Sequence, residues 1–431
     1  MRTDPAVEES LAQPPKVWSE AGRWWRHLSL RQTFSSLRHR NYRLWFWGQM
    51  VSLFGTWMQS TAQGFLIYEL TRSAAYLGLV GFAAGVPSWV LMPLGGVIAD
   101  RMWRRNLLLI TQSGMMVLSF LLAGLTFSGL IRPWHIIGLA LLFGAANAFD
   151  APARHAFVPD MVGRADLTNA IALNATIFNS ATVVGPAAAG ITYALFGPGW
   201  CFLVNGLSFT AVLVALLAMK MEQLPERSPS SSPWQELKEG FSYVLSHQLI
   251  RVLIGLVGVT SLFGVSFVVL IPAWAVEVLH GNATTNGWLY SARGGGALLG
   301  ALAIASLGRF DFKGRLLSLG TLVFPILLLV FAFVRSLPVA LLLILANGMT
   351  AIIIFNLANA LVQTLVLDSL RGRVMSIYSL TFFGFMPLGA LWVGTVAERF
   401  GEAVAILVNA LIMLVFSVFI WIWRPSLRRL A

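Results

Sequence analysis

The sequence predicts an all-α membrane protein with twelve transmembrane helices, and three observations lead to this class. Apolar residues make up 57% of the 431-residue chain and charged residues only 11%, whereas soluble domains carry roughly 25% charged residues. The apolar residues form long runs of the length that crosses a bilayer. The basic residues gather in alternate breaks between these runs, as in the cytoplasmic loops of membrane proteins.

Each apolar run is about 20 residues long, which is enough to span the hydrocarbon core. The twelve runs cover about residues 43–68, 74–98, 106–129, 134–156, 170–195, 200–221, 250–275, 286–307, 315–335, 338–362, 374–396 and 402–423. Basic breaks alternate with breaks that are poor in positive charge, and the segments before the first run and after the last are both basic. Both termini are therefore predicted to lie in the cytoplasm.

The longest break divides the runs into six and six, a symmetry that many secondary transporters show. It begins with Ser and Pro residues, which are typical of a linker, and continues as an amphipathic stretch. We expect a cytoplasmic N-terminal segment at 1–41, six-helix halves at 42–221 and 250–423, the linker at 222–249 and a basic cytoplasmic tail at 424–431.

Several classes of function are disfavoured by the composition. The net charge of +12 comes from residues between the spans, so it indicates topology rather than a nucleic-acid partner. The single Cys201 excludes a disulfide framework within one chain and a multi-cysteine metal site. The six histidines fall in loops or at span ends, and no phosphate-binding loop occurs. We expect no enzyme, no primary pump, no cofactor and a monomeric assembly. A non-transporting sensor remains a remote alternative.

Polar side chains recur along one face of the first span. They are spaced three and four residues apart, at Gln49, Ser52, Thr56, Gln59 and Gln63. Such a stripe avoids lipid, so it is predicted to line a water-filled cavity, although helix packing would also explain it. Other amides predicted on the same pathway are Asn179, Asn356, Asn359 and Gln363.

Arg293 lies about one and a half turns inside the eighth predicted span. A guanidinium at this depth would attract an anionic solute such as a catecholate or carboxylate. The alternative is that the side chain reaches out to the membrane surface. No acidic residue lies in the middle of any span, so the predicted cavity favours anionic or neutral solutes over cations.

The stretch from Gly95 to Arg105, Gly-Gly-Val-Ile-Ala-Asp-Arg-Met-Trp-Arg-Arg, resembles the loop motif between helices 2 and 3 of the major facilitator superfamily. Trp103 stands where the motif has glycine. The resemblance implies the major facilitator fold and a cytoplasmic gate, in which an acid at the end of helix 4 pairs with the motif arginine. The residues assigned to this gate are Asp100, Arg101, Arg104, Asp150 and Arg154.

The fifth span contains Gly185, Pro186 and Gly190, which partly match the glycine-proline motif of facilitator antiporters. This match predicts a helix bend at these residues, because proline removes a backbone hydrogen bond. A flexible packing helix is the alternative.

A narrower resemblance rests on five segments, which are Asn147–Arg154, Val158–Gly163, Asn169–Asn174, Val184–Pro186 and Arg371–Ser376. They are similar to the bacterial subgroup that contains the enterobactin exporter and macrolide efflux proteins. The resemblance implies a secondary exporter of a small organic solute in the bacterial inner membrane, working by alternating access with proton antiport. A siderophore is the expected substrate, with multidrug or macrolide efflux as the alternative. Proton coupling could run through Asp150, through the substrate's own proton, or not at all.

Overall fold

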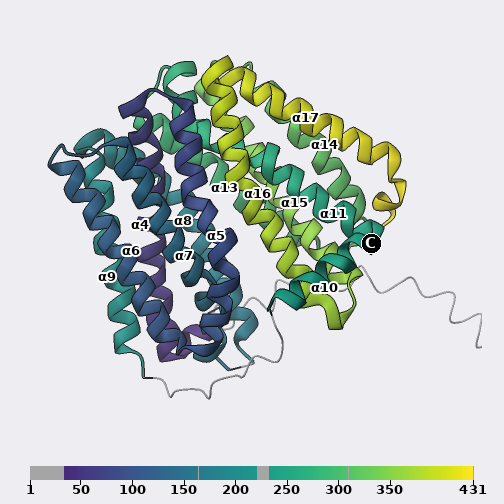
Figure 1. The fold of residues 1–431 in the computed structure, drawn as a ribbon, viewed down its shortest axis with the longest axis horizontal. Helices are drawn as coiled ribbons and strands as arrows, with labels where there is room; N and C mark the ends of the chain where they lie inside the picture. Colours follow the sequence, from purple (N-terminus) through teal and green to yellow (C-terminus); the bar gives the residue numbers. More distant parts are fainter. Residues whose placement is uncertain (1–33, 164, 221–232, 309, 431) are drawn as a thin grey trace, which may run out of the picture.

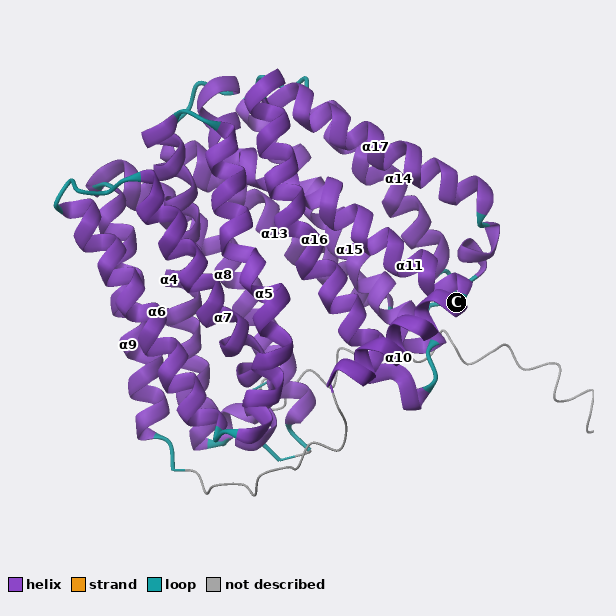
Figure 2. Cartoon of the chain, viewed as in Figure 1, coloured by secondary structure: helices purple, strands orange, loops and turns teal. Residues whose placement is uncertain are grey.

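Helices form every regular element of the described chain, as the apolar runs predict (Figure 2). The computed structural model describes residues 34–163, 165–220, 233–308 and 310–430, except for several side chains near the end of α5 and at the start of α10. Most of the predicted N-terminal segment, Arg164 and part of the predicted linker (221–232) lie outside these ranges.

The first group of helices follows the short 3₁₀-helix η2 (Ser35–Arg38). It comprises α4 (Arg40–Thr71), α5 (Ala74–Arg101), α6 (Arg104–Phe127), α7 (Pro133–Met161), α8 (Leu167–Phe196) and α9 (Pro198–Ala218). The second group begins with α10 (Pro233–Ser246), which covers the predicted amphipathic stretch, and α11 (Gln248–Val259). It continues with α13 (Ala283–Leu307), α14 (Lys313–Phe331), α15 (Leu337–Leu365), η6 (Asp368–Leu370), α16 (Arg371–Phe400), α17 (Glu402–Trp423) and η7 (Pro425–Arg429).

Ten helical segments within the described residues are long and apolar enough to cross a membrane. Helices α4 and α13 are not among the ten, although both are long. Each carries polar residues where a lipid-facing helix would carry apolar ones, the amide stripe on α4 and Arg293 on α13. The count of twelve spans therefore stays a prediction, as does the side on which the termini lie.

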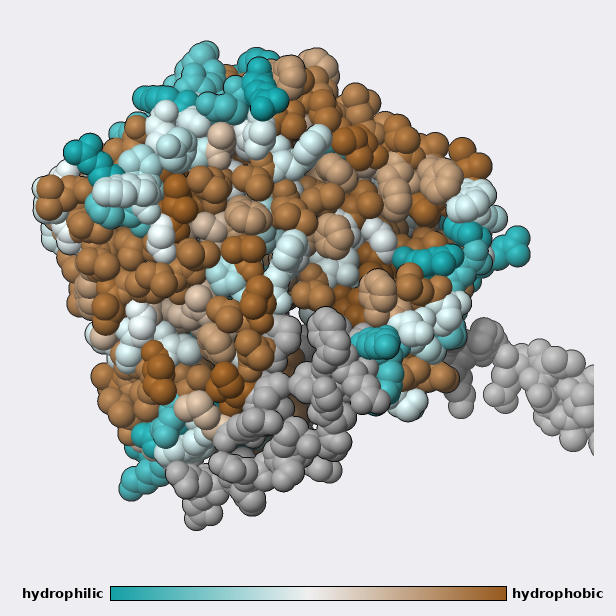
Figure 3. Space-filling model, in the orientation of Figure 1, coloured by the Kyte–Doolittle hydropathy of each residue, from teal (hydrophilic) through white to brown (hydrophobic). Residues whose placement is uncertain are grey.

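The two groups approach each other at the top of Figure 1 and separate toward the bottom. Hydrophobic side chains cover a broad band of the visible surface, while hydrophilic residues gather at its top and lower edges (Figure 3). Such a band is the surface expected of a protein surrounded by lipid. Contact between the groups is carried chiefly by α5 against α16 and by α8 against α13.

The segment predicted as one span at 250–275 is not a regular helix. After α11 it passes through η3 (Thr260–Gly264, a π-helix), η4 (Val265–Leu270, a 3₁₀-helix), α12 (Ile271–Ala273) and η5 (Trp274–Val278, a π-helix). Pro272 has no N–H group, so it cannot bond the carbonyl of Val268 in an α-helical pattern. That carbonyl accepts the N–H of Ile271 in the 3₁₀ pattern and the hydroxyl of Tyr290 on α13, the latter at 3.0 Å. The hydropathy pattern did not predict this departure from a regular α-helix.

Candidate solute pathway and gate

The two groups of helices are closed against each other along two seams of small residues. On α5, a methyl group added at Gly78 would lie 2.5 Å from the carbonyl oxygen of Ala390 on α16. On α13, a methyl group added at Gly287 would lie 2.5 Å from the carbonyl oxygen of Pro186 on α8. Side chains this small let the backbones touch. Both seams lie toward the end of the molecule that holds the α4–α5 turn.

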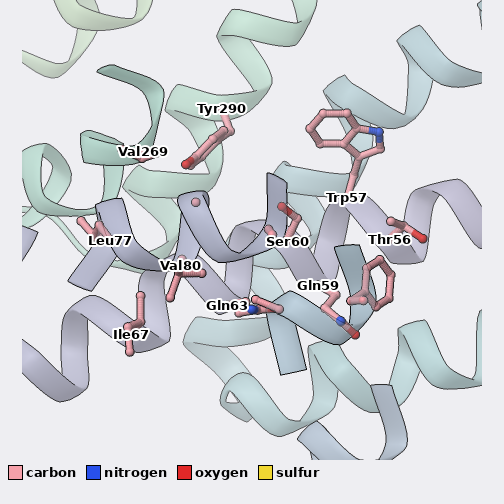
Figure 4. A pocket seen from close by; sticks show the side chains of 15 residues that line it. Thr56, Trp57, Gln59, Ser60, Gln63, Ile67, Leu77, Val80, Val269 and Tyr290 are labelled. Carbon is pink, nitrogen blue, oxygen red and sulfur yellow. The ribbon is translucent and has the colours of Figure 1, made fainter. Parts of the chain in front are cut away.

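A cavity of about 330 Å³ lies beside these seams (Figure 4). Its wall combines residues of α4, α5, α7, η4 and α13, so both groups of helices contribute to it. The polar lining residues are Thr56, Gln59, Ser60, Gln63 and Tyr290. None of the residues that line the cavity carries a charged side chain. The cavity is therefore amide- and hydroxyl-rich, with an aromatic and aliphatic remainder.

Polar groups of the wall are held by neighbours behind it. Gln59 accepts a hydrogen bond of 2.9 Å from the buried amide of Asn205 on α9, and Asn205 also lies 3.2 Å from the hydroxyl of Ser119 on α6. This network fixes which way the Gln59 amide points. The hydroxyl of Tyr290 is fixed by the Val268 carbonyl, so the wall presents oriented polar groups from both halves.

The predicted polar stripe of α4 divides into two parts. Thr56, Gln59 and Gln63 line the cavity, whereas Gln49 and Ser52 are buried and do not. The side-chain nitrogen of Gln49 is buried without a hydrogen-bond partner. The remainder of the stripe thus continues from the cavity toward the end where the two groups of helices separate.

The other predicted pathway residues lie outside the cavity wall. Arg293 follows Tyr290 by three residues on α13, and its backbone packs against Gly348 of α15. Asn179 lies on α8. On α15, Asn356 and Gln363 are exposed, and Gln363 donates a hydrogen bond to Asn359.

The residues of the predicted bend are packing surfaces of α8, which is helical throughout. Gly185 lies against α4, where an added methyl group would come within 2.7 Å of Trp57 Cβ. Pro186 and Gly190 lie against α13. The bend itself stays a prediction.

Among the predicted gate residues, Arg104 begins α6 and reaches α7. Its guanidinium donates to both carboxylate oxygens of Asp160, at 2.8 and 2.9 Å, and to the carbonyl of Ala156 at 3.1 Å. The resemblance predicted Asp150 as the partner on this helix; the contacts of Arg104 described here are to Asp160, ten residues further along α7. The side chains of Asp100 and Arg101 lie outside the described part of the structure.

Asp150 is the centre of a separate buried cluster between α6 and α7. One carboxylate oxygen accepts hydrogen bonds from Thr111 at 2.9 Å and Gln112 at 2.7 Å. The other lies 3.1 Å from Nη2 of Arg154, at an ion-pair distance but without hydrogen-bond geometry. The side chain of Asp150 is only 1% exposed, and a charge at this depth requires such partners.

A second set of polar contacts joins the two groups at the α4–α5 turn. Glu277 of η5 accepts a hydrogen bond of 2.8 Å from Tyr68 and lies 3.5 Å from the guanidinium of Arg72. Glu398 of α16 accepts from the hydroxyl of Ser73 at 2.8 Å and from the N–H of Ala75 at 3.1 Å. We call these contacts the turn latch.

The sequence did not single out Asp160, Asn205, Tyr290, Glu398 or the Thr111–Gln112 pair. Asp160 was visible within the Val-Pro-Asp segment that supports the family resemblance, but its distance from Arg104 in sequence gave no reason to pair them. The others owe their roles to contacts between helices far apart in the chain.

Two groups of helices around a central cavity are the architecture of the major facilitator fold. Solved structures of that type share it. The nucleoside transporter NupG superposes with a TM-score of 0.70 over 90% of this chain and 99% of its own, at 14% identity. This likeness shows the fold alone.

The chain belongs to the transmembrane secretion effector family, whose model matches residues 31–428. The staphyloferrin A transporter of Staphylococcus aureus is 26% identical, covering 83% of this chain and 90% of that protein. The multidrug efflux pump Tap of Mycolicibacterium fortuitum is 27% identical, covering 85% and 91%. The enterobactin exporter EntS of Shigella boydii is 25% identical, covering 94% and 96%. These relatives place the chain among the exporters of the major facilitator superfamily.

Proposed function

We propose that this protein exports a small organic solute, with a siderophore as the leading substrate class, across the bacterial inner membrane by alternating access. The observation that carries the proposal is the cavity, whose polar groups come from both halves and are oriented by neighbours behind them. A site built from both halves changes its access when the halves rock against each other.

The proposed orientation places the α4–α5 turn outside the cell. The opposite end carries Arg104, Arg105, Arg371 and Arg373, and basic residues favour the cytoplasmic side. With twelve spans, cytoplasmic termini and the two halves at 42–221 and 250–423, the end at which the two groups of helices separate in Figure 1 would then face the cytoplasm. The seams and the turn latch close the outer side.

The proposed inner gate comprises Asp100, Arg101, Arg104, Asp150 and Arg154, to which the contacts add Asp160. The Arg104–Asp160 pair joins α6 to α7 within the first half, so it holds the inner ends of these helices as one surface. Closure of the inner side would press that surface against the second half.

We assign proton coupling to Asp150. It is a buried carboxylate with one paired guanidinium and two neutral donors. Protonation would remove the charge that attracts Arg154, whose side chain is 24% exposed and could then turn toward other partners. A proton on Asp150 would therefore favour a different arrangement of the inner ends.

The substrate class follows from the charges of the pathway. The cavity wall holds no carboxylate, and an unpaired cation in such a site is costly. Anionic or neutral solutes fit better, and Arg293 is the cation nearest along α13. The cavity volume of about 330 Å³ is near the lower limit for a small-molecule site. We therefore expect the cavity to extend when the two halves move. The extended pathway would then include the remaining predicted residues, Gln49, Ser52, Asn179, Asn356, Asn359 and Gln363.

The alternative is a multidrug pump, which the similarity to Tap favours. Export of a labelled catecholate siderophore and of a cationic dye by the same cells, with and without an uncoupler, separates the two. We expect uncoupler-sensitive catecholate export that Gln63→Leu and Arg293→Ala weaken. Dye efflux without catecholate movement, unaffected by Arg293→Ala, would favour the pump. Absence of any transport would favour a sensor.

Accessibility of the cavity can be tested separately in a Cys201→Ala background. A cysteine at Gln63, in the cavity wall, should react with a small water-soluble thiol reagent in vesicles. A cysteine at Leu66, which is buried in helix packing, is the matched control and should react far less. Equal reaction at both positions would contradict the assignment of the cavity.

A further inference from the structure

A second cavity opens where the α5–α16 seam ends. These helices approach closely at Gly384, where an added methyl group would lie 2.3 Å from Nε1 of Trp89. Beyond this point lies a groove of about 760 Å³ whose walls come from α5, α10 and α16. Its main lining residues are Trp89, Lys238, Phe241, Leu380, Thr381 and Phe385.

The groove is apolar apart from the indole N–H of Trp89, the ammonium group of Lys238 and the hydroxyl of Thr381. Nε1 of Trp89 is buried and has no hydrogen-bond acceptor, which is costly for a buried donor. Lys238 stands at the mouth, exposed and without an ion-pair partner among the described residues. No carboxylate lines the groove. An occupant that satisfies these groups brings an acceptor, a negative charge and an apolar body.

Helix α10 sets the depth at which Lys238 lies. It is tied to the start of α16 by the ion pair of Glu239 with Arg373 and by Gly240, which packs on the Arg373 backbone. Phe241 and Leu245 on α10 are 55% and 49% exposed. A helix that combines exposed apolar residues with charged ones lies in the interface of a bilayer. Lys238 is then at the depth of the lipid headgroups.

The groove also adjoins the central cavity through α5. Gly81 and Ala84 of α5 line the cavity, and Trp89 of the same helix lines the groove between one and two turns further along. A molecule in the groove is separated from the cavity by the lower end of the α5–α16 seam. Rocking of the two halves moves this seam.

We propose that the groove is an entry site for an amphipathic anion that the exporter takes from the cytoplasmic leaflet. Its anionic end binds Lys238, and its apolar body packs between Phe241, Phe385 and Trp89. The volume suits one drug-sized molecule. This inference rests on the proposed function and adds the route by which a membrane-partitioned solute reaches the cavity.

The test uses the full chain in phosphatidylcholine vesicles and a diazirine-bearing lauric acid as the probe. Illumination and peptide mapping should place the label on α10 and on residues 377–385 of α16. Unlabelled laurate should compete, and its uncharged methyl ester should compete less. Lys238→Gln should raise the half-saturating concentration about fivefold, the effect of about 1 kcal/mol for one basic residue at a membrane surface.

Matched variants separate charge from folding. Lys238→Arg should retain labelling, and Trp89→Phe should weaken it by removing the N–H group while keeping an aromatic ring. Lys313→Gln removes another lysine from the second half and should change nothing. Identical labelling of wild type and Lys238→Gln would overturn the proposal. Label displaced by phosphatidylglycerol but not by laurate would also overturn it, in favour of a resident lipid.

Transport of the same probe into inverted vesicles distinguishes this inference from the proposed function. Lys238→Gln should raise KM and leave kcat unchanged, because it weakens entry only. Gln63→Leu should lower kcat and leave photolabelling intact. Labelling without any transport would retain the groove as a binding site and count against export. Transport with unchanged KM in Lys238→Gln would count against the groove alone.

Discussion

Tyr290 joins two features of the molecule at a single residue. Its ring lines the cavity, and its hydroxyl gives the Val268 carbonyl a second hydrogen bond beside that from the N–H of Ile271, at the point where Pro272 has no N–H to donate. Ser417 plays the same part for Thr321 of α14, which stands four residues before Pro325, at 2.8 Å. At Pro272 and Pro325, a hydroxyl from another helix therefore donates to the carbonyl that the proline cannot bond.

This pairing predicts a coupling between Tyr290 and Pro272. Tyr290→Phe leaves the Val268 carbonyl with only the hydrogen bond from Ile271, so it should cost about 0.5–1.5 kcal/mol of stability. In a Pro272→Ala background the alanine N–H can bond Val268, so the same change should cost less. Thermal unfolding in detergent of the wild type, the two single variants and the double variant measures this coupling as a double-mutant cycle. Tyr378→Phe, whose hydroxyl bonds Phe355, is the control and should be additive with Pro272→Ala.

Asp166 predicts a pH dependence on the cytoplasmic side of the proposed topology. The hydroxyl of Ser35 and the ring of His39 hydrogen-bond its carboxylate, with Arg38 nearby, and these contacts hold the pKa of Asp166 below its ordinary value. A lowered pKa means that the contact stabilises the fold above the ordinary carboxyl range. That contribution is lost as the pH falls through the lowered pKa.

Hydrogen exchange of residues 34–39 measures this effect. Protection should be full at neutral pH and fall only below about pH 4. Asp166→Asn should remove protection at neutral pH, and its difference from wild type should vanish in acid. Asp368→Asn, which breaks an exposed pair with Arg371, should leave the segment unchanged. Protection of Asp166→Asn equal to wild type at pH 7 would contradict the prediction.

At the scale of elements, hydropathy predicted where helices are but not which of them touch. The runs at 74–98 and 374–396 correspond to α5 and α16, each a few residues longer than predicted. Their contact rests on Gly78, Gly85 and Pro387, and a glycine in an apolar run gives no signal of its partner. The gate contact could not be predicted for the same reason. Arg104 binds Asp160 because α6 and α7 pack side by side, and the local sequence does not show which helices are neighbours.

Because α8 and α13 touch at the closed end, a larger side chain there should shift the equilibrium between the closed and open conformations of that end. Gly287→Ala places a methyl group 2.5 Å from the Pro186 carbonyl, so α8 and α13 must move apart there. The fraction of molecules open at the α4–α5 turn should rise, as measured by distances between spin labels on the outer ends of α8 and α13. Gly295→Ala on the same helix meets nothing within 4 Å and should leave the distances unchanged.

At the scale of the whole molecule, closure of one end combines apolar seams with the turn latch. The sequence predicted the cavity-facing amides of α4, since polar residues at helical spacing are a strong pattern in an apolar run. No local pattern marked Glu277, because its partners Tyr68 and Arg72 are about 200 residues earlier and on the other half. Contacts between halves form only in one conformation, so their partners follow from the fold and not from local sequence.

The turn latch should bias the whole transporter toward the state described here. Glu277→Gln keeps an acceptor for Tyr68 but removes the charge that attracts Arg72, and Glu398→Gln weakens the acceptor for Ser73 and Ala75. Exposed pairs contribute little individually, about 0–1 kcal/mol, so each single variant should change the conformational equilibrium by less than about fivefold. The double variant should shift it further, because Glu277 and Glu398 hydrogen-bond different residues, but less than the sum of the single effects, because both also repel the carboxylate of Glu402.

Spin labels at the outer ends of α5 and α16 measure the equilibrium, and labels at their inner ends should report the opposite change. Glu239→Gln, which removes a carboxylate at the other end of the molecule within the second half, is the matched control. Equal populations in wild type and the double variant would mean that the glycine seams alone hold the outer side closed. In that case Gly287→Ala should still shift the equilibrium, so the two experiments together assign closure to charge or to packing.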